Sequence, residues 1–390
     1  MLHLMNTYAR QAVAFTHGQG AWLYDEAGNR YLDGLAGIAV NTLGHAHPRL
    51  VKALSEQLGR LIHASNLYRV PEQERLAERL AALAAMDEVF FCNSGCEANE
   101  AAIKLARLYG HQKGIDAPAI IVMDKSFHGR TLATLSATGN RKVQAGFEPL
   151  VAGFVRVPFD DAAAVDAVAQ HNASVVAVLV EPVQGEGGIN VAHLDYLRAL
   201  RRICSERGWL LMVDEVQCGI GRTGKWFAHQ HANIIADVMT LAKGLGSGIP
   251  IGACLAVGPA AGVFKPGNHG STFGGNPLAC VAALTTLDVI AGEDLMARAV
   301  ALGERIRGGF REALGGVRGV VDIRGSGLMI GIELNRPCGA LVQEALGRGL
   351  LINVTADCIV RLLPPLILAD DEADRLVAMT ARLIRDFLGD

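Results

Sequence analysis

The sequence predicts an α/β protein, with a mainly parallel sheet sandwiched by helices and a smaller α+β domain after it. From Val89 onward, short apolar runs alternate with longer amphipathic ones, which is the pattern of strands separated by helices. Several short runs are apolar at every position, as strands covered on both faces are. With 390 residues and 51% hydrophobic content, the chain can form more than one layered unit.

The first predicted elements are a hairpin and a helix. Residues 21–25, "AWLYD", and residues 30–34, "RYLDG", bracket the turn "EAGN", and this arrangement predicts two paired strands. The segment "HPRLVKALSEQLGRL" carries apolar residues at helical spacing. We expect this N-terminal segment, residues 1–58, to pack with the small domain formed by the other end of the chain.

The large domain is predicted over residues 59–276. Its strands are expected at 88–93, 119–124, 174–182, 209–216, 237–242 and 251–257, and its clearest helices at 97–110 and 194–208. Helices that alternate with strands buried on both faces indicate a parallel or mixed sheet. Such sheets gather their functional sites at the carboxyl ends of the strands.

The small α+β domain is predicted over residues 277–390. One helix begins at Pro277, and a second covers residues 293–315. Strands are expected at 320–325, 327–334, 350–355 and 358–364, and a last helix begins near Asp370. No linker-like break precedes this domain.

Charge and composition exclude several classes of partner. The net charge is −3 and no basic block occurs, which argues against nucleic acid and favours a small ligand. The uncharged run at residues 244–264 contains six glycines and two prolines, so we interpret it as buried loops and strands and not as a membrane span. The N-terminal sequence has no signal-peptide pattern, so a cytoplasmic location is expected.

No metal site is predicted. The eight cysteines include no C-x-x-C pair, and no H-E-x-x-H motif occurs. His45 and His47 flank a single alanine, and ordinary hydrogen bonding is the simpler interpretation of such a pair. Reduced thiols in a reducing compartment fit the cysteine pattern best.

The stretch "NSGCEANEAAIKLARLYG" predicts a helix with an anion site at its start. Ser94 and Glu97 have the spacing of a capping box, and Gly110 is a plausible end of the helix. Gly95, beside the cap, leaves backbone N–H groups free at the positive end of the helix dipole. Taken alone, however, the motif more often marks an ordinary helix start.

Asp214 and Lys243 each follow a predicted strand. Lys243 is the only charged residue between Asp237 and Lys265, and an isolated buried ammonium is costly. A phosphate cradle, a strand-end carboxylate and a strand-end amine are what pyridoxal phosphate requires, since its phosphate needs N–H donors, its ring nitrogen an anion and its aldehyde an amine. The alternative is a lysine that reaches the surface and an aspartate that caps a turn.

Six ordered motifs resemble those of a known family. The span "LMVDEVQCGIGRTGKWFAHQHANIIADVMTLAKGLGSGIPIGA" is similar to the cofactor-attachment signature of the class III (ornithine-type) aminotransferases. The stretches "NSGCEANEAA", "FHGRT", "EPVQGEGG", "STFGGNPLAC" and "VRLLPPL" resemble the family's other landmarks, in the same order. The resemblance covers nearly the full chain and implies pyridoxal-phosphate fold type I with pyridoxal 5'-phosphate as cofactor.

The resemblance implies cofactor contacts residue by residue. Lys243 would bind the cofactor as a Schiff base and later transfer a proton, and Asp214 would pair with the ring nitrogen. The phosphate would accept hydrogen bonds from the backbone amides of Gly95 and Cys96, and Phe127 and Val216 would pack on the two faces of the ring. Gln217 would bind the ring hydroxyl, and Thr272 of a partner subunit would add a hydroxyl group. Many relatives have a hydroxyl residue at position 96, so the thiol puts cofactor affinity in question.

The resemblance also implies substrate contacts. Arg130 and Ser271 resemble the positions that hold an acylated amino acid. Arg361 resembles the arginine that binds the α-carboxylate of glutamate or 2-oxoglutarate, and Glu186 resembles the gate that pairs with that arginine when the other substrate is bound. Glu181 is expected to be structural. The family implies a homodimer with shared active sites.

Within the family, the likeness is greatest to enzymes that act on acetylornithine. The expected reaction moves the δ-amino group of N2-acetylornithine to 2-oxoglutarate by a ping-pong mechanism, and Gly37 would leave room for the acyl group. Succinylornithine, succinyldiaminopimelate, ornithine and 4-aminobutyrate stay open as donors. A decarboxylase or aminomutase of the same fold, or a non-catalytic protein that binds a phosphate ligand, are more remote alternatives.

Overall fold

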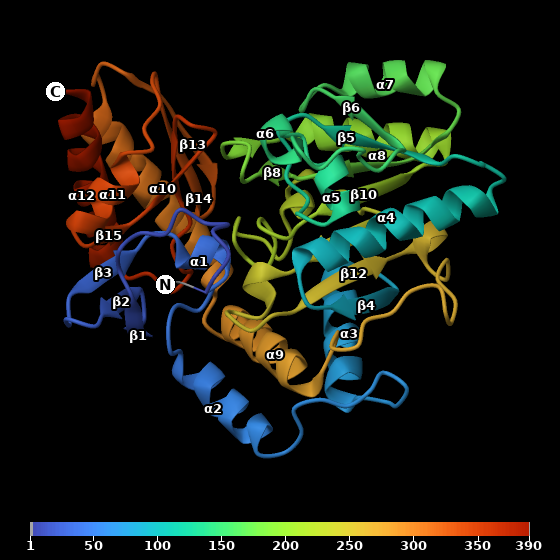
Figure 1. Cartoon of the computed structure of the whole chain (residues 1–390), viewed down its shortest axis with the longest axis horizontal. Coiled ribbons are helices and arrows are strands. Elements are labelled where there is room, and N and C mark those ends of the chain that lie inside the picture. Colours follow the sequence, from blue (N-terminus) through green and yellow to red (C-terminus); the bar gives the residue numbers. More distant parts are fainter. Residues whose placement is uncertain (1–2, 390) are drawn as a thin grey trace.

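A seven-stranded sheet forms the centre of the large unit. The computed structural model describes residues 3–389. The strand order is β4 (Glu88–Cys92), β12 (Gly252–Ala256), β11 (Val238–Leu241), β10 (Leu210–Asp214), β7 (Val175–Val180), β5 (Ala119–Met123) and β6 (Phe154–Val157). Only β12 runs antiparallel to its neighbours. The predicted mainly parallel sheet is therefore confirmed (Figure 1).

Helices cover both faces of this sheet. Helix α4 (Gly95–Gln112) packs with its buried side chains on one face, in the apolar cluster that includes Ile120, Leu210 and Val238. Helix α8 (Leu194–Arg207) packs on the other face, in the cluster that holds the alternate strand positions, such as Ile121 and Leu211. Successive strand residues point to opposite faces of the sheet, and both faces are covered by helices. Every position of these strands is therefore buried, which explains the runs that are apolar at every position.

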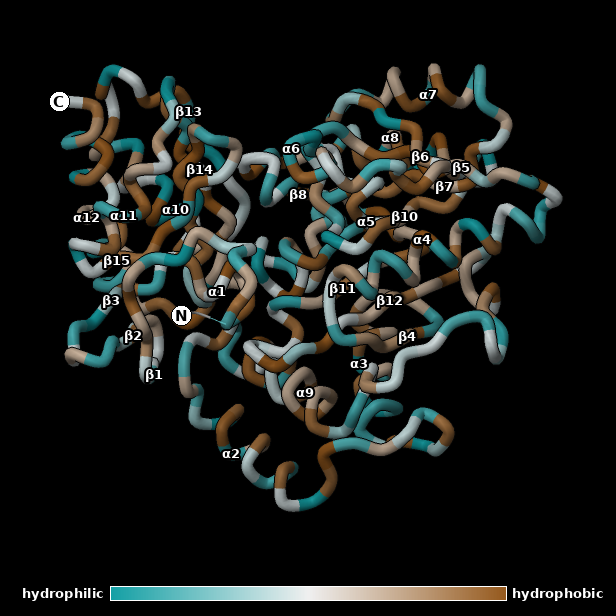
Figure 2. The backbone as a smooth tube through the Cα atoms, in the orientation of Figure 1, coloured by the Kyte–Doolittle hydropathy of each residue, from teal (hydrophilic) through white to brown (hydrophobic). Residues whose placement is uncertain are grey.

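Figure 2 shows hydrophobic residues concentrated along the central strands. The remaining helices of the large unit are α3 (Pro71–Ala84), α5 (Leu132–Ala137), α6 (Arg141–Gln144) and α7 (Ala162–His171), with short 3-10 turns η1 (Ala228–Ala232), η2 (Lys243–Leu245) and η3 (Gly258–Ala260). No helix within residues 3–389 is both long and apolar enough to cross a membrane.

The C-terminal part is a second α+β layer structure. Its antiparallel sheet has the order β13 (Val320–Ser326), β14 (Met329–Leu334), β17 (Ile359–Leu362) and β16 (Asn353–Thr355). Its helices are α10 (Leu295–Leu314), α11 (Leu341–Gly347) and α12 (Asp370–Leu388). Helix α9 (Pro277–Gly292) precedes them and packs on α3 of the large unit as well as on α10. The hairpin of β8 (Val183–Gln184) and β9 (Asn190–Val191) lies in the large unit and contacts β13.

The N-terminal strands share a sheet with the C-terminal part. Strands β1 (Phe15–Gln19), β2 (Trp22–Asp25) and β3 (Arg30–Asp33) are antiparallel, and β3 pairs in parallel with β15 (Leu350–Leu351). The indole of Trp22 donates a 2.6 Å hydrogen bond to Glu372 in α12. In Figure 1 these blue strands lie beside the orange and red C-terminal elements.

The segment between β3 and the large unit contains two helices, α1 (Ala36–Ala39) and α2 (Pro48–Leu58), and α2 packs on α9. The domain boundaries expected at 58/59 and 276/277 stay predictions. The strand expected at 350–355 is two strands in the structure, β15 and β16, and they belong to different sheets.

Gly110 does not end its helix, so that prediction is wrong. Helix α4 continues to Gln112. At Gly110 an added Cβ would lie 2.7 Å from Pro118 Cγ and 2.8 Å from Val176 Cγ1. The glycine is therefore needed because the helix lies close to the sheet there, and not because the backbone has to leave the helix.

We predict that Gly110→Ala lowers the free energy of unfolding by about 1–3 kcal/mol, the usual cost of forcing extra volume into a packed core. The matched control is Gly308→Ala in the interior of α10, where no atom outside the helix lies within 4 Å. There the same change is expected to raise stability by about 0.5–1 kcal/mol. Urea denaturation midpoints measure both, and equal effects at the two positions would contradict the packing explanation.

Candidate functional site

The largest group of predicted site residues lines one cavity of about 320 Å³. It lies where the carboxyl ends of the parallel strands meet the N-terminus of α4, as expected for a sheet of this kind. Eight predicted residues line it: Gly95, Cys96, Phe127, Glu186, Asp214, Val216, Gln217 and Lys243. Arg361 contacts this lining through Glu186, whereas Arg130, Ser271 and Thr272 are not part of it.

The start of α4 forms one end of the cavity. Ser94 caps the helix, and its Oγ accepts a 3.2 Å hydrogen bond from the amide of Glu97. The Glu97 carboxylate returns to the amide of Asn93 and not to that of Ser94 as in a standard capping box. The amides of Gly95 and Cys96 have no acceptor inside the helix, so this turn can receive an anion.

Close packing fixes the shape of this turn. At Gly95 an added Cβ would lie 2.7 Å from Val216 Cγ1, so only glycine allows the turn to approach the strand-end residue. The thiol of Cys96 accepts a 3.2 Å hydrogen bond from the amide of Arg130. The sulfur at position 96 therefore helps to hold the loop that follows Phe127, and the backbone amides of the turn stay available to an anion.

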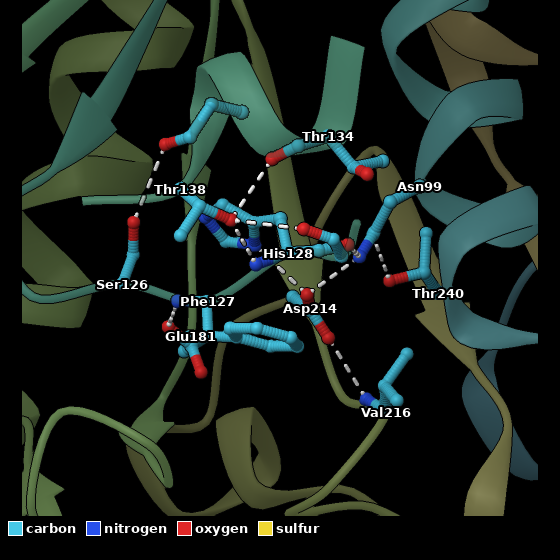
Figure 3. A network of polar contacts seen from close by, with 12 residues as sticks. Asn99, Ser126, Phe127, His128, Thr134, Thr138, Glu181, Asp214, Val216 and Thr240 are labelled. Carbon is cyan, nitrogen blue, oxygen red and sulfur yellow. Dashed lines mark hydrogen bonds and ion pairs between the residues drawn. The ribbon is translucent and has the colours of Figure 1, made fainter. Parts of the chain in front are cut away.

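The Asp214 carboxylate lies at the end of β10 and is 4% exposed. Its Oδ2 accepts hydrogen bonds from Asn99 Nδ2 at 2.7 Å and His128 Nδ1 at 2.8 Å. Its Oδ1 accepts one from the amide of Val216 at 3.0 Å (Figure 3). Because no arginine or lysine of the described chain forms an ion pair with it, this carboxylate can stabilise a cationic group of a ligand.

Lys243 follows β11 as the first residue of η2, with a positive φ of 41°. Burial lowers the pKa of its amine, and the nearby cation of Arg361 opposes the effect of Glu186, Asp214 and Glu181, which favour the charged form. Within residues 3–389 its Nζ donates no hydrogen bond. A neutral amine in a cavity can act as a nucleophile and as a proton acceptor.

Phe127 and Val216 both line the cavity, as expected of side chains that enclose a flat ring. The Phe127 amide donates a 2.9 Å hydrogen bond to Glu181 Oε2, and the guanidinium of Arg130 lies 5.8 Å from the Phe127 ring centre. Gln217 is 8% exposed, and its Oε1 is buried with no donor in the described chain. A ligand hydroxyl could satisfy that acceptor.

Glu181 has a larger part in the cavity than the sequence suggested. It lines the cavity and anchors the backbone of Phe127. Burial raises the pKa of Glu181 well above its usual range, and the negative charge of Asp214 adds to this rise. Its role in holding Phe127 agrees with the structural function expected for it.

A fully buried Arg361 and a partly exposed Glu186 form an ion pair beside the cavity. Arg361, in β17, is fully buried and donates to Glu186 Oε1 from Nη1 at 2.5 Å and to Asn353 Oδ1 from Nε at 2.9 Å. Burial alone would raise the pKa of Glu186, but the charge and hydrogen bond of Arg361 lower it overall. Arg361 Nη2 is buried and has no partner within residues 3–389.

Arg130, Ser271 and Thr272 lie outside the cavity of a single chain. The Arg130 side chain is exposed near Phe127. Ser271 and Thr272 line a separate hollow with Glu97 and His269. Ser271 Oγ accepts hydrogen bonds from Asn93 Nδ2 and the amide of Gly274, and Asn93 lines both spaces.

Sequence reasoning missed Asn99, His128 and Asn353, which hold the charged groups of the site. A signal existed for Asn99, because a buried asparagine on an otherwise apolar helix face needs partners. Gly37 does not line the cavity, whereas Val40 does. Within the described chain, no group of three or more metal-ligating side chains occurs.

The cavity has the chemical features that pyridoxal phosphate needs. Free amides at the start of α4 suit its phosphate, and the Asp214 carboxylate suits its ring nitrogen. The Lys243 amine, which has no partner in the described chain, suits its aldehyde, and the unsatisfied Gln217 oxygen suits its ring hydroxyl. The residues present therefore fit this group.

Comparisons with known proteins were made over the whole chain. Residues 5–384 match the family model described as "Aminotransferase class-III". A curated acetylornithine aminotransferase of Nitrosomonas europaea is 62% identical and covers 100% of this chain and 99% of its own length. An acetylornithine aminotransferase 1 of Bordetella parapertussis is 58% identical, covering 99% and 98%.

Solved structures agree in fold. The ornithine aminotransferase of Toxoplasma gondii has a TM-score of 0.95 at 34% identity and covers 99% of this chain and 93% of its own. The N-acetylornithine aminotransferase of Stenotrophomonas maltophilia has a TM-score of 0.85 at 35% identity and covers 98% of both chains.

We predict that Lys243→Met stabilises the ligand-free protein near pH 7 by about 1–3 kcal/mol, the typical cost of a buried polar group without a partner. The folded-state pKa of Lys243 lies below 10.5, so the unfolded chain binds more protons between these two values. Wild-type stability then rises with pH through that window, and the advantage of the variant should shrink as the pH approaches 10.5.

Urea denaturation between pH 7 and pH 10 measures this difference. Lys142→Met is the control, since Lys142 is exposed and pairs with Asp357 on the surface. Its effect should stay within about 0.5 kcal/mol. A Lys243→Met protein that is less stable than the wild type at pH 7 would show that burial of the amine does not destabilise the ligand-free protein.

Proposed function

The chain belongs to the class III aminotransferases, and on this premise we propose that it transfers the δ-amino group of N2-acetylornithine to 2-oxoglutarate, with pyridoxal 5'-phosphate as cofactor. The products are N-acetylglutamate 5-semialdehyde and glutamate. The observation that carries the proposal is the meeting of the Lys243 amine, the Asp214 carboxylate and the start of α4 in one cavity. Relatives named acetylornithine aminotransferase, 58–62% identical over the full chain, support this choice of donor.

When bound, the cofactor supplies a protonated ring that accepts the electron pair released as a C–H bond of the amino donor breaks. Asp214 supplies the negative charge that keeps the ring nitrogen protonated. Phe127 and Val216 line the cavity as apolar walls and exclude water from it. The amides of Gly95 and Cys96, at the positive end of the helix dipole, bind the phosphate.

Lys243 holds and moves the proton. Burial keeps the pKa of its amine below the usual value of 10.5, so more of it is neutral at physiological pH than of an exposed lysine. A neutral amine can attack an aldehyde and can then carry a proton between two carbon atoms of the reacting pair. Its position at the end of a buried strand keeps it in place for both steps.

Glu186 and Arg361 select which end of a substrate enters. With 2-oxoglutarate, the α-carboxylate replaces Glu186 and binds Arg361 through two parallel hydrogen bonds, one of them from the unpartnered Nη2. With acetylornithine, whose δ-carbon carries no carboxylate, Glu186 stays paired with Arg361. We assign the α-carboxylate of the acylated donor to the exposed guanidinium of Arg130, which lies 5.8 Å from the ring centre of Phe127.

A homodimer with shared active sites is part of the proposal. Apolar side chains are exposed on residues 58–68 and at position 273: Leu58, Leu61, Ile62, Leu67, Tyr68 and Phe273. These segments lie together, because Asn66 donates hydrogen bonds to the carbonyls of Ser271 and Gly274. Exposed apolar patches of this kind mark interfaces, and a second copy docked here would bring Thr272 to the neighbouring cavity. A single-chain mass in sedimentation equilibrium would exclude this dimer.

A cytoplasmic location completes the proposal. All eight cysteines are free and most are buried, and reduced thiols of this kind fit a reducing compartment. The test is fractionation with an antibody to the protein, and recovery in an oxidising compartment would contradict this location.

The function is tested by mixing the purified enzyme with acetylornithine alone and following the absorbance of the bound cofactor. We expect the absorbance to change without 2-oxoglutarate and to return when it is added, because the two half-reactions are separate. A panel of succinylornithine, succinyldiaminopimelate, ornithine and 4-aminobutyrate identifies the donor if acetylornithine leaves the spectrum unchanged. Turnover that does not depend on a keto acid would instead indicate a decarboxylase or aminomutase.

We predict opposite effects for two arginine variants. Arg361→Lys loses the two-pronged contact, so the KM for 2-oxoglutarate should rise about 10–100-fold, as for a lost hydrogen bond between charged groups. The KM for acetylornithine should change by less than about threefold. Arg130→Lys should show the reverse pattern in steady-state kinetics with each substrate varied in turn. If either variant raises both KM values equally, the two arginines do not divide the substrates in this way.

A further inference from the structure

The hydrogen bonds to Asp214 leave a single acceptor position free. A carboxylate offers about four acceptor positions, two on each oxygen. Oδ2 receives two donors, Asn99 Nδ2 at 2.7 Å and His128 Nδ1 at 2.8 Å, and Oδ1 receives only the amide of Val216 at 3.0 Å. The one remaining position is therefore on Oδ1 (Figure 3).

The orientation of Asn99 follows from its partners. Its Nδ2 donates to the carbonyl of His128 at 2.9 Å as well as to Asp214, and both of these oxygens only accept. Its Oδ1 accepts a 2.8 Å hydrogen bond from the hydroxyl of Thr240 in β11. With 1% of its surface exposed, Asn99 has no competing water, so its amide cannot flip without losing all three bonds.

The imidazole of His128 is held as one tautomer. Nδ1 must carry a proton to bond with Asp214, because a carboxylate oxygen only accepts. Nε2 is buried and has no partner within residues 3–389. A second proton would bury an unsatisfied donor there, at a higher cost than an idle acceptor. The hydrogen bond from Nδ1 therefore fixes the orientation of the ring toward Asp214.

Helix α4 connects both ends of the cavity through this network. Gly95 and Cys96 begin the helix, and Asn99 lies about one turn further along the same helix. The phosphate turn and the orientation of Asp214 thus depend on one rigid element. A shift of α4 along the sheet would move both together.

We propose that Asn99 and His128 are positioning residues for the cofactor. By filling both acceptor positions of Oδ2, they leave Oδ1 as the oxygen that accepts the N–H of the ring. This inference rests on the proposed function. Both side chains donate to Asp214, so we expect them to act through this carboxylate on the electron-accepting strength and the binding of the cofactor, and not on the affinity for substrate.

The test uses His128→Leu, which removes the donor, and His128→Asn, whose Nδ2 replaces it at about the same place. For His128→Leu we expect the dissociation constant of pyridoxal phosphate to rise about 10–100-fold on reconstitution of the apoenzyme. We also expect kcat to fall at least about tenfold, with KM values for both substrates within about threefold. His128→Asn should recover both quantities to within about threefold of the wild type.

Two results would overturn the proposal. One is a His128→Leu enzyme with the wild-type dissociation constant and kcat. The other is a His128→Asn enzyme as impaired as His128→Leu, because the imidazole would then only fill space. Circular dichroism of each apoenzyme shows whether it folds.

If His128→Leu does not fold, Thr240→Val decides, since it removes the hydroxyl that orients Asn99 and keeps the side-chain shape. A dissociation constant about 3–10-fold higher supports the proposal, and an unchanged one overturns it. Thr286→Val is the matched control, because Thr286 is equally buried but bonds only within α9. Binding of pyridoxal phosphate by the wild-type protein is measured before any variant is tested. A wild-type protein that does not bind it would refute the proposed function itself.

Discussion

Charge inside a cavity of low polarity is the constraint on which this structure depends. Five charged residues lie close to one another in or beside the cavity: Asp214, Glu181, Glu186, Lys243 and Arg361. Each is accommodated differently: Arg361 pairs with Glu186, burial raises the pKa of Glu181, and burial lowers the pKa of Lys243. Asp214 has no arginine or lysine partner within the described chain and accepts hydrogen bonds from Asn99, His128 and the amide of Val216. It is therefore the charge that most needs a cationic ligand.

The parallel sheet makes this arrangement possible. Strands β7, β10 and β11 end at the same edge, so the residues after them meet without any loop having to reach far. Helix α4 adds its positive end to that edge, and the antiparallel β12 closes the side next to β4. The C-terminal sheet contributes Arg361 from the opposite side, so substrate recognition and cofactor chemistry come from different layers of the protein.

Sequence alone predicted the residues that follow apolar runs. Asp214 and Lys243 could be found because each follows an apolar run that predicts a buried strand. Ser94 could be found because it has capping-box spacing before an amphipathic helix. The partners of these residues could not be found in this way. The Asn99 and His128 contacts join α4, β10 and the loop after β5, and a sequence does not state which strands are neighbours. For the same reason the split of residues 350–355 between two sheets, and the packing role of Gly110, became visible only in three dimensions.

The pairing of β3 with β15 has a consequence for how the protein is made. Because β15 (Leu350–Leu351) is synthesised long after β3 (Arg30–Asp33), the edge of β3 stays without its neighbour until residue 351 has been added. Asp214 and Lys243 are synthesised well before Arg361. A nascent chain thus contains its reactive groups before it contains Arg361, the residue that selects the substrate. The unpaired edge of β3 is exposed for most of that interval. Until β15 is made, this edge of β3 is open to pairing with another chain.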